Sequence, residues 1–265
     1  MQPIPSSRQY PVRVHALLAP RQARTRRPRG VALRQLFAAV ALGLLATACG
    51  TAEAEPERTG ATAAAQPDSA HAALLARADL GRIMGAESAP VWLVVISDFQ
   101  CPYCKVWHDE TQPLVERDFV RTGKVRLAYL NFPSSSHRNA WPAHEAAMCA
   151  AEQDAFWPLS EAIFATQGDW KTRVNAAAFF DSLAGTLPLD RPRLRSCIAD
   201  GALRATIRAD YERSVRIGIG STPSFLVQSA AGTRALIGAQ PYAAFKGALD
   251  QALSEVAAGN HSPAN

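Results

Sequence analysis

The stretch "VWLVVISDFQCPYCKVWH", residues 91–108, joins an apolar run to two cysteines that are three positions apart. Its first seven residues are almost continuously apolar and rich in β-branched side chains, which is typical of a buried strand. The pattern over residues 102–119 predicts a helix, and Pro102 suits the first helical turn because proline lacks an N–H. We therefore expect Cys101 at the start of a helix, with Cys104 one turn further on the same face.

This position favours redox chemistry. The first N–H groups of a helix are unpaired, and together with the helix dipole they stabilise a thiolate. The pKa of Cys101 is therefore expected to fall from ~8.5 towards ~3.5–7. A stable thiolate stabilises the reduced pair, so the Cys101–Cys104 disulfide becomes an oxidant. Tyr103 is neutral and supplies no cation, which predicts a moderate redox potential.

Two other interpretations of these cysteines are less favoured by the sequence. A structural zinc site needs four ligands, commonly a second Cys-x-x-Cys or paired histidines, and neither occurs. His108 would add only one ligand, and it is more typical of a packed or solvated helix residue than of a catalyst. Two inert buried thiols are the other alternative. We expect no metal and no cofactor.

Outward from this stretch, alternating strand and helix patterns predict an α/β protein. The expected elements are helices at 71–85, 102–119 and 240–257, and strands at 91–97, 124–133, 221–228 and 234–238. Between the second and third strands the chain is expected to be helical, from about residue 140 to 216. The sequence therefore predicts a sheet with an inserted helical subdomain.

A second motif, "GSTPSFLV" at residues 220–227, follows the cysteines by about 120 residues. With Cys-Pro-Tyr-Cys after a strand, it resembles the DsbA-like family of the thioredoxin fold, and the likeness runs from about Leu80 to Val256. In that fold a cis-proline loop faces the Cys-x-x-Cys and pairs with bound substrate. The resemblance implies that Cys101 and Cys104 form a redox disulfide, and that the catalytic residues are Cys101, Cys104, Thr222 and Pro223. An ordinary proline at the start of a strand is the alternative for Pro223.

The segment "NFPSSSHRNAWPAHEAAMCAAEQDAFWPLSEAIF", residues 131–164, resembles the start of the helical insertion in one branch of this family. That branch couples to a membrane quinone-linked thiol oxidase, which the resemblance implies as a partner. Some relatives also carry a structural disulfide in this subdomain, where Cys149 and Cys197 lie. We expect these two to be bridged in an oxidising compartment, the alternative being free buried cysteines that pack as small hydrophobes.

One position departs from the family pattern. Many relatives carry a buried acid six residues before the first cysteine, which helps to move the proton of the second thiol. Here that position is Val95. Asp98 is nearer to the cysteines, but strand alternation need not point its side chain the same way. Proton transfer through water is therefore expected.

The N-terminal 48 residues differ in composition from the rest. They contain eight arginines and no acid, so the remaining chain has 20 basic and 23 acidic residues, a net charge of −3. This balance argues against a nucleic-acid partner. The apolar run Leu36–Ala48 suits a signal peptide and is short for a membrane span, which needs ~20 residues. Residues 1–48 are predicted to be a signal peptide, with a true translation start near Val31 as a further hypothesis.

Cys49 follows Ala46-Thr47-Ala48, and two cleavage sites fit this sequence. Ala-x-Ala suits ordinary signal peptidase, whereas small residues before a cysteine resemble a bacterial lipobox, although that motif usually has leucine where Ala46 stands. Lipidation of Cys49 is favoured because it explains the odd count of five cysteines. Residues 49–70 are predicted to be a flexible tether to a thioredoxin-like domain at 71–265.

Together these features predict a thiol–disulfide oxidoreductase of the periplasm or cell envelope that oxidises thiols of exported proteins. The alternatives are a disulfide reductase or isomerase, and a non-catalytic lipoprotein that holds peptides as a scaffold. Exposed apolar side chains near the cysteines would offer a surface for peptides, and the candidates are Phe99, Tyr103, Trp107 and Phe225.

Overall fold

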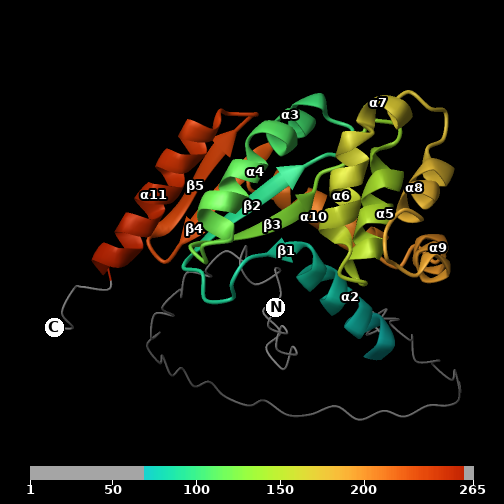
Figure 1. The fold of residues 1–265 in the computed structure, drawn as a ribbon, viewed down its shortest axis with the longest axis horizontal. Helices are drawn as coiled ribbons and strands as arrows, with labels where there is room; N and C mark the ends of the chain where they lie inside the picture. The colour runs from blue at the N-terminus through green and yellow to red at the C-terminus, as the bar shows by residue number, and fades with distance from the viewer. Residues whose placement is uncertain (1–68, 260–265) are drawn as a thin grey trace, which may run out of the picture. The chain divides into compact units, whose positions relative to one another are not determined.

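The computed structural model describes residues 69–259. The predicted signal peptide, Cys49 and all but the last two residues of the predicted tether lie outside this range. Within it, the predicted α/β architecture, a sheet with an inserted helical subdomain, is confirmed (Figure 1).

The sheet has five strands in the order β1-β3-β2-β4-β5 (Figure 1). The strands are β1 (Ile83–Met84), β2 (Val91–Ser97), β3 (Val125–Asn131), β4 (Ser224–Ser229) and β5 (Gly232–Ile237). The central strand β2 is parallel to β3 and antiparallel to β4. All seven residues of β3 and six of the seven of β2 are buried, which explains their continuous apolar runs.

Helices pack on the sheet and extend beyond it. The helices outside the insertion are α2 (Ser69–Gly81), α3 (Pro102–Glu110), α4 (Gln112–Val115), the π-helical turn η1 (Glu116–Val120) and α11 (Tyr242–Gly259). In Figure 1, α3, α4 and α11 lie in front of the sheet and α10 lies behind it. The front layer encloses a core of side chains from three strands and these helices, including Leu93, Val95, Trp107, Phe225 and Phe245.

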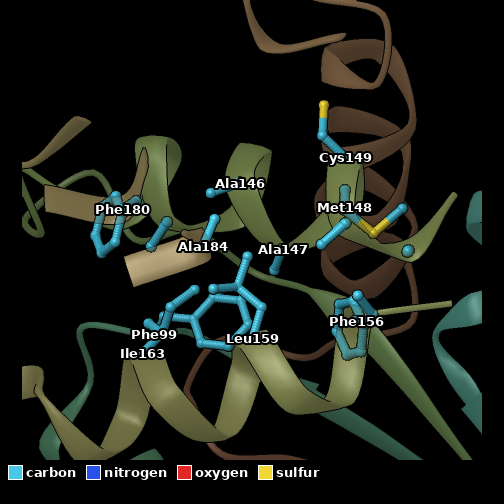
Figure 2. Close-up of a cluster of buried hydrophobic side chains, with 14 of the residues drawn as sticks. Phe99, Ala146, Ala147, Met148, Cys149, Phe156, Leu159, Ile163, Phe180 and Ala184 are labelled. Carbon is cyan, nitrogen blue, oxygen red and sulfur yellow. The ribbon is translucent and has the colours of Figure 1, made fainter. Parts of the chain in front are cut away.

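The helical subdomain lies between β3 and β4 in the sequence. Its helices are α5 (Ala140–Ala151), α6 (Phe156–Ala165), α7 (Gln167–Trp170), α8 (Ala177–Ala184), α9 (Arg191–Ala199) and α10 (Arg204–Arg216). Small alanine side chains of α5 pack against aromatic and aliphatic side chains of α6 and α8 (Figure 2). The same cluster contains Phe99, Cys101 and Cys104, so the subdomain forms one wall around the cysteine pair.

The structure differs from the sequence-based expectation before β2. The helix expected over residues 71–85 ends at Gly81, and the edge strand β1 follows it. A Cβ at Gly81 would lie 2.0 Å from the carbonyl oxygen of Ala151, so the chain passes α5 where only glycine fits. Strand β1 has two residues that pair with β3, which is too short for an alternating pattern to reveal.

Candidate active site

Strand β2 and helix α3 together place the two cysteines. Cys101 occupies the N-cap position of α3 with extended backbone angles (φ −69°, ψ 124°), and Pro102 opens the helix. No side chain caps this helix end, so the first N–H groups of α3 are free to face the sulfur. Cys104 lies one turn further, inside the core, and both cysteines carry free thiols. The structure confirms the predicted position of Cys101 at the start of a helix.

The surroundings of Cys101 favour its thiolate. The pKa of Cys101 is lowered to about 6, chiefly by a hydrogen bond from the Cys104 thiol. The Thr222 side chain and the backbone N–H groups of Tyr103 and Cys104 lower the pKa further, against the effect of partial burial. This value lies within the range expected from the helix start alone, but the neighbouring thiol is the largest single cause.

Cys104 is perturbed in the opposite direction. Burial raises the pKa of Cys104 well above its ordinary value, and the adjacent Cys101 raises it again. The backbone N–H of Asp98 lies 3.4 Å from the Cys104 sulfur and partly offsets this rise. The pair therefore has one thiol whose pKa is lowered and one more deeply buried thiol whose pKa is raised.

A loop far away in the sequence faces Cys101. The Thr222–Pro223 peptide bond is cis, and β4 begins at the next residue, Ser224. The Cys101 thiol lies 3.5 Å from the Thr222 carbonyl oxygen and is oriented to donate a hydrogen bond to it. Strand β4 pairs with β2, and this pairing brings the two motifs together across 121 residues.

The helical subdomain holds the loop that precedes α3. The side-chain amide of Gln167 donates to the carbonyl oxygens of Phe99 (2.8 Å) and Cys101 (3.1 Å). The Gln100 side chain accepts from the backbone N–H of Asn139 (2.7 Å) and donates to the Lys171 carbonyl (3.2 Å). Sequence analysis did not find these contacts, because glutamine carries no spacing signal that marks such a role.

Asp98 and His137 form a second feature that the sequence did not predict. The Asp98 side chain is fully buried, and His137 Nδ1 lies 2.7 Å from one of its oxygens. The hydrogen bond to Asp98 raises the pKa of His137. His137 belongs to the loop after β3, inside the quoted insertion segment, where nothing in its neighbours distinguishes it from a surface histidine.

Residues 78–251 match the family model described as Thioredoxin. The chain belongs to this thioredoxin family. Its DsbA-like character, predicted from the two motifs, is also confirmed by the comparisons.

Among curated relatives, this thioredoxin-family chain is 26% identical over 148 residues to disulfide bond formation protein D of Bacillus subtilis, covering 55% of this chain and 66% of that one. It is 32% identical over 150 residues to the Na(+)/H(+) antiporter NhaA 3 of Salinispora tropica. That match covers 56% of this chain, and this chain spans only 22% of the antiporter.

Solved structures share the fold. The α-DsbA1 of Wolbachia pipientis matches with a TM-score of 0.62 at 17% identity, over 68% of this chain and 94% of that one. The oxidised BdbD of Bacillus subtilis matches with a TM-score of 0.58 at 22% identity, over 66% of this chain and 94% of that one.

The predicted aromatic surface of this thioredoxin-family protein is largely wrong. Phe99, Trp107 and Phe225 are buried in the two hydrophobic cores, because each is needed to fill a layer beside the sheet. Tyr103 is the exception, with 65% of its surface exposed beside the cysteines. Val95, at the position of the acid in many relatives, packs in the front core.

The predicted structural disulfide and His108 have no contact with the redox sulfurs among the described hydrogen bonds. Cys149 of α5 and Cys197 of α9 are joined by a disulfide with a Cα–Cα distance of 5.8 Å. His108 stacks on Phe164 with ring centroids 4.6 Å apart, and burial lowers its pKa. Among residues 69–259, no three His, Cys, Asp or Glu side chains are grouped so as to hold a metal ion.

Proposed function

We propose that this chain is a thiol–disulfide oxidoreductase of the cell envelope that oxidises the thiols of exported proteins. The observation that carries the proposal is the asymmetric pair: Cys101 has a pKa of about 6 and faces Thr222, while burial raises the pKa of Cys104. Such a pair has one sulfur that substrate can reach and one that resolves the intermediate.

In the proposed reaction, a substrate thiolate attacks Cys101 of the Cys101–Cys104 disulfide. The bond between the two cysteines breaks, a mixed disulfide forms at Cys101, and Cys104 leaves as a thiolate that takes up a proton. A second substrate thiolate then attacks the substrate sulfur of the mixed disulfide and releases Cys101 as a thiolate. The substrate loses two electrons and gains a disulfide, and the cysteine pair gains both electrons. Thr222 and Pro223 would hold the substrate backbone beside Cys101.

The thiolate of Cys101 supports the oxidising direction. Groups that lower its pKa stabilise the reduced pair, and a stable reduced pair makes the disulfide a stronger oxidant. The name of the Bacillus subtilis relative, disulfide bond formation protein D, agrees with this direction. A membrane quinone-linked thiol oxidase would restore the disulfide, by taking the two electrons from Cys101 and Cys104.

The proposed location follows from the leader. A signal peptide over residues 1–48 would export the chain, and lipidation of Cys49 would anchor it to a membrane through the 49–70 tether. No helix between residues 69 and 259 is long and apolar enough to cross a bilayer.

The test is the equilibrium potential of the Cys101–Cys104 couple in the full chain, measured against glutathione. A potential between about −120 and −200 mV supports an oxidant, whereas one near −270 mV makes the protein a reductase and overturns the proposed direction. A parallel assay follows disulfide formation in a reduced peptide with two cysteines. An oxidoreductase loses this activity in the Cys101→Ser variant, so a Cys101→Ser protein as active as wild type would make the chain a scaffold and overturn the proposal.

A further inference from the structure

Asp98, whose backbone contacts Cys104, has a buried carboxylate that accepts three N–H donors. It accepts from the backbone N–H of Gln100 (2.8 Å), the backbone N–H of Ser134 (2.8 Å) and Nδ1 of His137 (2.7 Å). The backbone N–H of the same residue faces the Cys104 sulfur at 3.4 Å, so Asp98 contacts both the cysteine pair and His137.

His137 faces the Asp98 carboxylate. Its side chain is 25% exposed and reaches Asp98 from the loop after β3. Two ionisable groups act on the imidazole from the elements packed around it: Asp98 at the end of β2 and Cys101 at the start of α3. Arg138, its neighbour in the loop, is exposed. Both Asp98 and the Cys101 thiolate raise the pKa of His137, so the imidazolium is favoured when the thiolate is present.

We propose that His137 is a positioning residue for the redox pair, whose imidazolium neutralises the buried Asp98 carboxylate and so protects the Cys101 thiolate from that negative charge. The inference rests on the proposed function and names the residue that tunes it. The two residues between the cysteines, Pro102 and Tyr103, are uncharged, so the His137 imidazolium would be the cation of this site.

The charge states make the inference specific. With His137 protonated, the Asp98–His137 pair has no net charge, and the pKa of Cys101 is set by the groups that contact its own sulfur. When His137 loses its proton or is replaced, one negative charge remains beside the site and opposes a second one on Cys101. The reduced state then loses stability relative to the disulfide, and the pair becomes a weaker oxidant.

The test compares His137→Gln, Asp98→Asn and the double variant, each made in the full chain. The readouts are the pH dependence of Cys101 alkylation by iodoacetamide and the equilibrium constant with glutathione. For His137→Gln we expect alkylation at pH 6 to slow about threefold, and the equilibrium constant to shift about threefold towards the disulfide, or about 14 mV. The double variant removes both charges and is expected to return to near wild-type values.

The double variant separates electrostatics from structure. If His137 only held its loop, adding Asp98→Asn would leave the defect unchanged or worsen it, and the inference would be overturned. No change in His137→Gln would also overturn it. His108→Gln is the matched control, because His108 lies on α3 but stacks on Phe164, and it is expected to leave both readouts unchanged.

Alkylation reports on Cys101 whether or not the protein oxidises substrates. If His137→Gln slows alkylation and the wild-type couple has the potential of a reductant, the proposed direction is refuted and the role of His137 stands. If the couple has the potential of an oxidant and His137→Gln changes nothing, the proposed direction stands and the role of His137 is refuted.

Discussion

The two cysteine pairs of this protein are buried alike but differ in their surroundings. Cys101 and Cys104 are 5% and 1% exposed, and Cys149 and Cys197 are 1% and 5% exposed, all within one hydrophobic cluster. Cys149 lies inside α5, where backbone N–H groups are used within the helix, and it bridges α5 to α9. Cys101 stands at the start of α3, where these groups are free and a loop carbonyl lies opposite.

Burial alone therefore does not decide what a cysteine does in this fold. Cys149 packs among apolar side chains and is bonded to Cys197, so that pair can serve as a permanent cross-link. At Cys101 a neighbouring thiol, Thr222 and the helix start all stabilise the negative charge. The difference lies in these polar groups, and the Cys104 thiol and the Thr222 side chain can each be removed by substitution.

Replacing either redox cysteine is expected to have the largest effect. Cys101→Ser should abolish thiol oxidation, because no other described sulfur has a lowered pKa. Cys104→Ser keeps the Cys101 thiolate, which should attack the disulfide of an oxidised substrate peptide and release one peptide sulfur as a thiolate. The mixed disulfide at Cys101 should then accumulate, because no Cys104 thiol is present to resolve it, and mass spectrometry under non-reducing conditions would detect it. Mixed disulfides on Cys104 in the Cys101→Ser variant would reverse the assigned roles.

Removing the second pair should damage stability and spare the chemistry. Cys149→Ala with Cys197→Ala opens a loop of 48 residues, and in the chain-entropy model this lowers the free energy of unfolding by about 4 kcal/mol. Urea unfolding would measure the loss. The potential of Cys101–Cys104 should stay within a few millivolts of wild type, and a large shift would contradict the division of roles between the pairs.

The pH dependence should distinguish the two thiols of the redox pair. With a pKa of about 6, Cys101 should react half-maximally with iodoacetamide near pH 6, while Cys104 stays protected through neutral pH. Because the folded pKa is depressed, the stabilisation of the reduced state is full above ~8.5 and is lost as the pH falls through about 6. Quenched alkylation followed by peptide mapping measures both, and equal reactivity of the two thiols would refute the asymmetry.

The sequence predicted most of the fold because the fold depends on local patterns. The apolar runs at β2 and β3, the helix start at Cys101 and the Thr-Pro before β4 are all readable from neighbouring residues. It missed β1, which has only two residues, and it placed buried aromatics such as Phe99 on the surface. It also missed Gln167 and His137, whose contacts with the site depend on long-range packing that no local spacing encodes.

The smallest predicted effect is that of removing the Thr222 hydroxyl, one of the groups that distinguish Cys101 from Cys149. Its side chain is one of several groups that lower the pKa of Cys101, and it ranks below the Cys104 thiol. Thr222→Val keeps the side-chain shape and removes the hydroxyl, so the pKa of Cys101 should rise and alkylation at pH 6 should slow about twofold. Thr222→Ser restores a hydroxyl and should restore the rate. If valine and serine behave alike, the hydroxyl has no part in stabilising the thiolate, and the exchangeability of this pair rests on Cys104 and the helix start alone.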